Sequence, residues 1–109
     1  MSTPSDVRVH REEDRYVAEV DGQEAGFTVY RVRGGNRYFF PHTEIFEGWG
    51  GSGVGTTLVR EALDDVRANG GTVIPICPFV WAFIQRHPEY GDLVDHDTFD
   101  RIADRLHES

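Results

Sequence analysis

The sequence of 109 residues contains no lysine, a single cysteine and no long apolar run. Without a lysine it cannot form the Walker-type phosphate loop, which needs a Lys followed by Ser or Thr after its last glycine. One cysteine cannot form an internal disulfide, so Cys77 is either a buried small side chain or a reactive thiol. No apolar stretch approaches the length of a membrane span, and residues 1–6 lack the charged-then-apolar pattern of a signal peptide. We therefore predict a cytoplasmic protein without a membrane partner.

The charge is strongly acidic, with 19 Asp and Glu residues against 11 arginines and a net charge of −8. A nucleic-acid groove needs a basic face, so we predict no nucleic-acid partner. An acidic surface attracts cationic molecules such as amines. The simpler interpretation is that the charge keeps a small protein soluble, because the acidic residues are mostly dispersed. The length predicts a single domain over residues 1–109, with residues 1–6 as a frayed terminus.

Glycine is concentrated in one stretch, residues 48–55, where Gly-Trp-Gly-Gly-Ser-Gly-Val-Gly holds five glycines. Such a turn can adopt positive φ angles and present several backbone N–H groups to a ligand. Apolar residues recur at helical spacing directly after it, so the positive end of a helix dipole adjoins the turn. This arrangement favours a phosphate or pyrophosphate. A dinucleotide-binding fold is disfavoured because residues 70–73, Gly-Gly-Thr-Val, lack the expected acid.

The segments before this turn alternate apolar and polar residues and are separated by turn residues, which predicts an antiparallel meander of four strands. The strands are expected at residues 7–11, 16–20, 24–33 and 37–46, with a tight type I′ hairpin turn at Asp21-Gly22. After the glycine-rich turn we expect a helix that begins at about Gly53 and ends in a left-handed stop at residues 69–71, Asn-Gly-Gly, then a parallel fifth strand at residues 72–76. A helix beginning at Pro78, whose apolar face would be Phe79, Val80, Phe83 and Ile84, a short sixth strand at residues 93–94 and a last helix capped by Asp97 or Thr98 complete an α/β fold.

The fourth strand contains Pro41, which cannot donate a ladder hydrogen bond and is expected only at an edge or a bulge. Strict alternation would place Tyr38, Phe40, His42 and Glu44 on one face of the sheet. A bulge near Pro41 would break that register.

Residues 51–58, Gly-Ser-Gly-Val-Gly-Thr-Thr-Leu, resemble the R-G-x-G-x-G-x-x-L signature of the Gcn5-related N-acetyltransferases. His-Thr-Glu-Ile at 42–45, Pro-Ile-Cys-Pro-Phe-Val at 75–80 and His-Pro-Glu-Tyr at 87–90 resemble the small, single-domain branch of that family. The resemblance covers about half of the chain. It implies a compact acetyltransferase-like fold with acetyl-coenzyme A as co-substrate, and a fourth strand that splays from the fifth to admit the pantetheine arm.

The resemblance also implies which residues bind coenzyme A. Backbone amides of the fourth strand would hold the pantetheine and the thioester carbonyl, and the loop would hold the pyrophosphate. The implied binding residues are Thr43, Glu44, Ile45, Phe46, Gly50, Gly51, Ser52, Gly53, Val54, Gly55 and Thr56. Gly50 stands where the family usually has Arg or Gln, which would leave phosphate binding to backbone amides. The five histidines lack metal-ligand spacing, so we predict no metal.

Four residues are candidates for proton transfer or covalent catalysis. His42 and Glu44 are candidate bases, of which His42 is favoured because histidine titrates near neutral pH; its alternative is a packed strand histidine. Cys77 has three open roles: acid to the coenzyme thiolate, nucleophile activated by His42, or inert core residue. Tyr90 is a further candidate acid by resemblance, and its alternative role is packing after the Pro88 turn.

The predicted function is transfer of an acetyl group to an unidentified amine on a small molecule or a protein. Typical family members insert two helices between the first two strands, whereas residues 11–15 connect them here. The acceptor site is therefore expected to be open, or completed by a second copy or a partner chain. The alternative is a non-catalytic acyl-coenzyme A binding or protein-interaction module of the same fold. Gly50 and the missing helices favour this alternative, whereas His42, Glu44 and Cys77 favour an enzyme.

Overall fold

The computed structural model describes residues 7–108, so the predicted frayed segment 1–6 lies outside the described residues. Five strands form one sheet in the order β1-β2-β3-β4-β5. The first four pair antiparallel and the fifth pairs parallel to β4, which confirms the predicted α/β architecture. The strands are β1 (Val7–Arg11), β2 (Arg15–Val20), β3 (Gln23–Arg33), β4 (Arg37–Ile45) and β5 (Thr72–Ile74).

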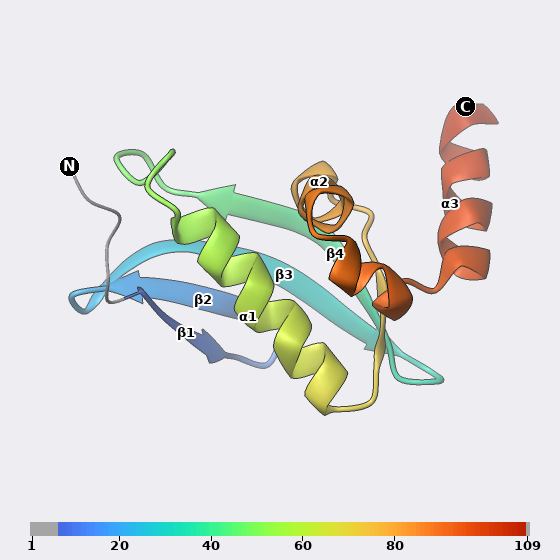
Figure 1. The fold of residues 1–109 in the computed structure, drawn as a ribbon, viewed down its shortest axis with the longest axis horizontal. Helices are drawn as coiled ribbons and strands as arrows, with labels where there is room; N and C mark the ends of the chain where they lie inside the picture. The colour runs from blue at the N-terminus through green and yellow to red at the C-terminus, as the bar shows by residue number, and fades with distance from the viewer. Residues whose placement is uncertain (1–6, 109) are drawn as a thin grey trace.

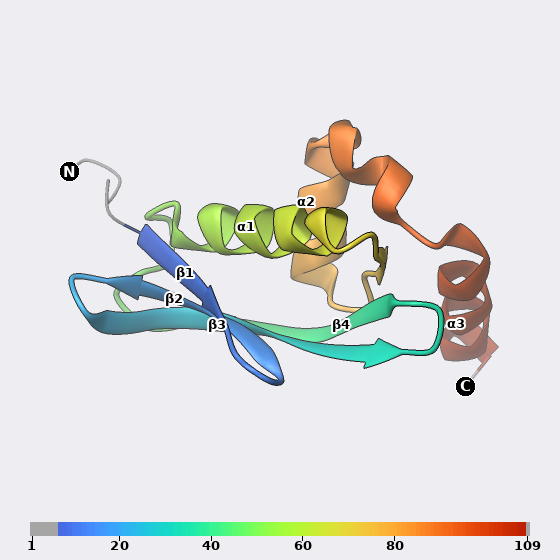
Figure 2. The ribbon, with the colours of Figure 1, turned by 90° about the horizontal axis from the view of Figure 1, so that it is seen from below.

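The helices are α1 (Val54–Ala68), α2 (Pro78–Arg86), the 3-10 helix η1 (Pro88–Leu93) and α3 (His96–Glu108). Helix α1 lies diagonally across one face of the sheet (Figure 1). Seen edge-on, the sheet carries α1 on one side, while the opposite side of β1, β2 and β3 faces away from all the helices that the structure describes (Figure 2). The α1 side is therefore the core face, and the other side is called the outer face below.

The core forms between α1 and this face of the sheet. The apolar stripe of α1 is fully buried, as its helical spacing predicts. It packs with buried side chains of the strands, among them Tyr16, Ala18 and Phe40. The buried α1 residues are Val54, Leu58, Val59, Ala62, Leu63 and Val66. The helix ends before Gly70, whose φ of 71° confirms the predicted left-handed stop.

Two connections match their predictions. Asp21 and Gly22 have φ angles of 51° and 80°, as a type I′ hairpin turn between β2 and β3 requires. Strands β1 and β2 are joined by residues 12–14 alone, so the two helices that family members usually insert at this point are missing.

The C-terminal third differs in detail from the sequence predictions. Strand β5 ends at Ile74, and the predicted sixth strand is reduced to a single parallel bridge between Val73 and Val94. The predicted caps Asp97 and Thr98 are wrong because α3 begins earlier, at His96. Its cap is Asp95, whose carboxylate accepts hydrogen bonds from the Thr98 N–H at 3.2 Å and hydroxyl at 2.9 Å. These bonds lower the pKa of Asp95.

A bulge at Pro41 divides β4 into two halves. Val29 of β3 pairs with His42, but Arg31 pairs with Phe39, so Phe40 and Pro41 together face one residue of β3. The extra residue reverses the alternation, which confirms the expected bulge and makes the strict alternation wrong. Beyond the bulge, Thr43 and Ile45 share the core face with Tyr38 and Phe40, while His42 and Glu44 lie on the outer face.

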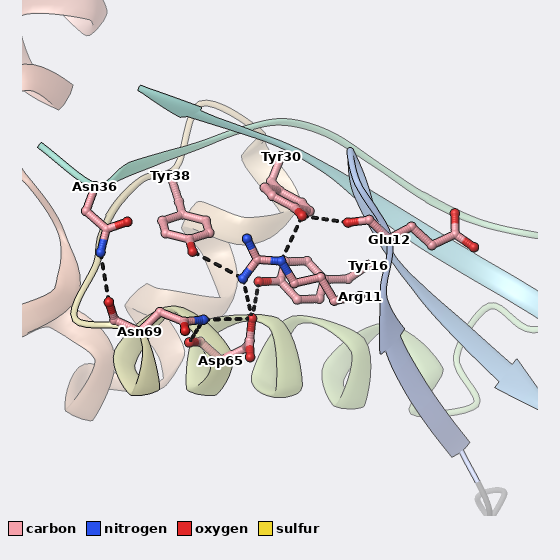
Figure 3. Close-up of polar contacts among 8 residues, drawn as sticks. All are labelled: Arg11, Glu12, Tyr16, Tyr30, Asn36, Tyr38, Asp65 and Asn69. Atoms are coloured by element: carbon pink, nitrogen blue, oxygen red, sulfur yellow. Dashed lines mark hydrogen bonds and ion pairs between the residues drawn. The ribbon is translucent and has the colours of Figure 1, made fainter. Parts of the chain in front are cut away.

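Arg11, at the end of edge strand β1, joins this strand to α1 (Figure 3). Its guanidinium lies 4.9 to 5.8 Å from the ring centres of Tyr16, Tyr30 and Tyr38 and donates to Asp65 at 2.9 Å. The Tyr16 hydroxyl donates to the same Asp65 oxygen at 2.6 Å. Burial and this bond raise the pKa of Tyr16. Asp65 therefore holds β1 and β2 to the helix layer where the family's two extra helices are missing.

Substitution of Asp65 measures how much this junction contributes to the free energy of unfolding. We expect Asp65→Ala to lower the free energy of unfolding by about 2 kcal/mol, because the buried Tyr16 hydroxyl loses its acceptor and Arg11 its counter-charge. Urea unfolding followed by circular dichroism measures the change. Glu61→Ala, an exposed position of the same helix, is the control and should cost under about 0.5 kcal/mol. Equal losses in the two variants would contradict the junction.

Candidate functional site

The glycine-rich segment between β4 and α1 folds into two successive tight turns. The Trp49 N–H donates to the Phe46 carbonyl at 3.0 Å, and the Ser52 N–H donates to the Trp49 carbonyl at 3.2 Å. Gly48, Gly51 and Gly53 have φ angles of 93°, 77° and 91°. Residues with a side chain rarely adopt this conformation, which explains the glycines at these three positions. Gly50 has no positive φ, and a Cβ there would meet open space.

The start of α1 presents unpaired backbone donors. The first intrahelical hydrogen bond runs from the Thr57 N–H to the Gly53 carbonyl at 3.1 Å. The N–H groups of Val54, Gly55 and Thr56 precede it and therefore have no partner within the helix. Gly53 provides no side-chain cap. These donors and the positive end of the helix dipole point at one place, which suits an anion.

Strand β4 has an open edge beyond the bulge. Within β4, strand β5 pairs only with Arg37, Tyr38 and Phe39. The Cys77 N–H then donates to the Phe40 carbonyl at 2.8 Å. From Pro41 onward, no strand among the described residues pairs with this side of β4. The predicted splaying of β4 from β5 is present.

The direction of the β4 amides follows from one hydrogen bond. The Phe46 N–H donates to the Ala25 carbonyl of the β3 side at 2.9 Å. Because successive N–H groups of a strand point to opposite sides, the Glu44 N–H also points toward β3, and the Thr43 and Ile45 N–H groups point to the open edge. Of the four amides predicted to bind pantetheine, those of Thr43 and Ile45 point to the open edge, that of Glu44 points toward β3, and that of Phe46 is paired with the Ala25 carbonyl.

The loop, the start of α1 and the start of α2 enclose a pocket of about 380 Å³. Its lining residues are Ile45, Trp49, Gly50, Gly51, Gly53, Gly55, Thr56 and Phe79. The pocket thus joins the loop to the open half of β4. Phe79 was predicted to lie on the apolar face of α2, but its side chain is 42% exposed at the pocket. The buried face of α2 consists of Val80, Phe83 and Ile84, and Phe79 lies at the edge of this stripe, where helical spacing alone does not decide between burial and exposure.

Cys77 lies on the core face beside β4, at the N-terminal boundary of α2. The residue is only 5% exposed. Its Sγ is 3.4 Å from Thr43 Oγ1, which in turn lies 2.8 Å from Thr28 Oγ1. The thiol is therefore held next to the half of β4 whose edge is open.

His42 and Glu44 lie together on the outer face. Their side chains are 58% and 53% exposed, and His42 Nε2 is 3.5 Å from Glu44 Oε1. The His42 ring centre is 6.0 Å from that of Phe27 on β3. Since adjacent residues of a strand point to opposite faces, β4 separates the His42 ring from the Thr43 hydroxyl and Cys77. His42 is therefore close to Glu44, as the sequence suggested, but it lies on the opposite face of β4 from Cys77.

Tyr90 lies in η1, away from the pocket. Its hydroxyl donates to Asp64 Oδ1 at 2.8 Å, and burial together with this bond raises the pKa of Tyr90 to about 12. Asp64 is ten residues beyond Val54 on α1, a distance of about 15 Å along the helix axis. Tyr90 is also in contact with Phe83, with ring centres 5.5 Å apart. The structure therefore places it in a packing position.

Within residues 7–108, no group of three or more His, Cys, Asp or Glu side chains is arranged to hold a metal ion. None of the helices described here is both long and apolar enough to span a bilayer.

The chain matches the family model of the GCN5-related N-acetyl-transferases over residues 15–93 of its 109. It belongs to this family. The match runs from β2 to the end of η1 and includes the loop, the open half of β4 and Cys77. The family assigns the chain to the acetyltransferases as a class.

Two solved structures are similar to the chain. A GCN5-like N-acetyltransferase candidate from Staphylococcus aureus, determined in solution, is 22% identical, with a TM-score of 0.64, and the similarity covers 83% of this chain and 89% of that one. It shows the same fold. A candidate acetyltransferase of the family from Desulfovibrio desulfuricans is 26% identical over 54% of this chain and 39% of its own length, with a TM-score of 0.49. No curated protein matches the chain in sequence.

The position of Tyr90 leads to a prediction about its role. We expect Tyr90→Phe to lower the free energy of unfolding by about 1 kcal/mol, because Asp64 loses a hydrogen bond. We expect no change in the acetyl-transfer rate per folded molecule. Asp64→Asn, which alters the same contact from the helix side, is the matched variant for comparison. A tenfold or greater loss of rate in Tyr90→Phe at unchanged stability would show that the hydroxyl takes part in catalysis.

Proposed function

We propose that the protein is an N-acetyltransferase that binds acetyl-coenzyme A and transfers its acetyl group to an amine. One observation carries the proposal: the unpaired amides at the start of α1 and the open half of β4 meet in a single pocket. The first group of donors suits a pyrophosphate, and the second suits an extended chain with amide groups. Coenzyme A contains both, joined in this order.

The pyrophosphate would bind at the loop, where the amides of Val54, Gly55 and Thr56 and the helix dipole favour negative charge. The pantetheine arm would then extend along β4 and accept hydrogen bonds from Ile45 and Thr43, in the manner of an added strand. This path leads toward Cys77, whose Sγ lies 3.4 Å from Thr43 Oγ1. The thioester would thus arrive at the end of the path where the thiol lies.

Acetyl transfer requires attack of a neutral amine nitrogen on the thioester carbonyl carbon. The tetrahedral intermediate then expels the coenzyme thiolate, and the amine loses a proton. We assign the two proton transfers to opposite faces of β4. His42, supported by Glu44, accepts the proton of the amine on the outer face, and Cys77 donates a proton to the thiolate on the core face.

This division favours direct transfer over an acetyl-Cys77 intermediate. A nucleophilic Cys77 needs a base within hydrogen-bond reach, and β4 separates its thiol from the His42 ring. The acceptor would approach His42 from the outer face, which the described helices leave uncovered beside β3 and β4 (Figure 2). The acceptor is an amine of a small molecule or a protein. It would be held either by this open face alone or with the help of a second copy or partner chain.

A non-catalytic acyl-coenzyme A binding module is the second candidate function. The observation in its favour is that Cys77 is only 5% exposed. Such a module would bind coenzyme A as tightly as the enzyme and would release none from acetyl-coenzyme A in the presence of amines. Binding and turnover therefore have to be measured separately.

The binding half of the proposal is tested at a glycine of the loop. We expect Gly53→Val to weaken coenzyme A binding at least a hundredfold, because a β-branched residue is strained at a φ of 91° and the turn must rearrange. Gly34→Ala is the control, since this glycine lies outside the pocket and its Cβ meets open space, and should change affinity less than about threefold. Calorimetric titration measures both. Retained affinity in a folded Gly53→Val would remove the loop from the binding site.

The catalytic half is tested at His42 and Cys77. We expect His42→Ala and Cys77→Ala each to reduce the acetyl-transfer rate by about 10² or more, as for loss of a general base or acid, while coenzyme A affinity changes less than about threefold. The rate is followed as coenzyme A released with a panel of primary amines. Mass spectrometry of the wild-type protein after incubation with acetyl-coenzyme A should show no added acetyl group on Cys77. A stable acetyl adduct there would contradict direct transfer.

A further inference from the structure

We propose that Phe79 is a specificity-determining residue of this site: its ring holds the pantetheine arm, so that the protein distinguishes coenzyme A thioesters from nucleotides that lack the arm. The inference rests on the proposed function. It assigns a binding role to an aromatic side chain whose spacing predicts only a place on the apolar face of α2.

Among residues 7–102, Phe79 and Val32 are the two large apolar residues that are strongly exposed, at 42% and 40%. Val32 lies near the end of the β3–β4 hairpin, whereas Phe79 lines the pocket beside the glycine-rich loop. The buried stripe of α2 consists of Val80, Phe83 and Ile84. The Phe79 ring is therefore presented to the pocket by a well-anchored helix.

The ring lies directly against the backbone of α1. A Cβ at Gly55 would be 2.5 Å from Cζ of Phe79 and 3.4 Å from Cγ1 of Ile45. The three residues thus meet at one point, where the starts of α1 and α2 approach the open half of β4. A side chain at Gly55 would occupy the space that the ring fills, so the ring would have to move.

This meeting point lies between the two ends of the proposed binding path. Gly55 belongs to the anion-binding start of α1, and Ile45 is two residues from Thr43, which contacts the Cys77 thiol. Phe79 is likewise two residues from Cys77. A ligand that reaches from the loop to the thiol passes the exposed ring. The stretch of coenzyme A that would lie there is the uncharged arm, whose methyl and methylene groups would cover the ring and remove apolar surface from water.

The test compares coenzyme A with adenosine 5′-diphosphate, which has the pyrophosphate and the adenine but no arm. We expect Phe79→Ala to weaken coenzyme A binding at least tenfold and to change the affinity for adenosine 5′-diphosphate less than twofold. Phe79→Leu, which keeps apolar bulk, should recover most of the affinity for coenzyme A. Val32→Ala, an equally exposed apolar position outside the pocket, should change neither affinity.

A double-mutant cycle tests the contact with Gly55 independently. Gly55→Ala should weaken coenzyme A binding at least tenfold, because the new methyl displaces the ring into the path of the arm. In the Phe79→Ala background the same substitution should change affinity less than threefold, since the clash is gone. Circular dichroism shows that each variant is folded.

The outcomes separate this inference from the function on which it rests. If the wild-type protein binds neither ligand, the proposed function fails. If it binds coenzyme A but Phe79→Ala weakens both ligands equally or neither, the coenzyme site stands and the role of Phe79 is overturned. Additive effects of Gly55→Ala and Phe79→Ala would also overturn it.

Discussion

The site depends on the missing N–H of Pro41. Pro41 cannot donate a ladder hydrogen bond, and it lies where β4 loses its pairing with β5. The bulge at this position divides the strand into two halves. Before the bulge, β4 pairs with β5 and contributes Tyr38 and Phe40 to the core. After it, the strand keeps β3 on one side and leaves the other edge open. The free amides, the pocket and the contact of Cys77 with Thr43 all lie in this second half.

Helix α1 contributes to both the pocket and the core. Its first turn supplies the unpaired amides of the pocket, and its remaining turns cover the core face of the sheet. Asp65, in the second half of the helix, also holds the edge strand β1 through Arg11 (Figure 3). This junction stabilises the end of the sheet that lacks the two extra helices. The Asp65 junction and the proposed anion site thus lie at opposite ends of one helix.

Much of the fold could be predicted from the sequence because its signals are local. The Asp21-Gly22 turn, the glycines at positive φ and the apolar stripe of α1 each depend on neighbouring residues alone. The faces of β4 could not be predicted with the same certainty, because one extra residue at Pro41 reverses the side on which every later side chain lies.

The features that were missed depend on contacts distant in the sequence. Tyr90 is held by Asp64, 26 residues away, and no pattern around either residue indicates the pair. Phe79 satisfies a helical apolar pattern equally well as a buried or an exposed residue. Only its contact with Gly55, from a different helix, decides between the two. The glycine-rich loop could therefore be located from the sequence, whereas the place of Phe79 in the pocket could not.

In the proposed reaction, the two proton-transfer groups lie on opposite sides of one strand, β4. Side chains of adjacent residues leave a strand on opposite faces, so His42 and Thr43 place a candidate base and the partner of a candidate acid on two sides of one backbone. A thioester carbon at the open edge would be reached by the acceptor from the outer face and by the coenzyme from the core face. In the proposed reaction the amine nitrogen and the thioester carbon would meet at this open edge, where the bond between them forms, while the remaining parts of the two substrates would lie on opposite faces of the strand.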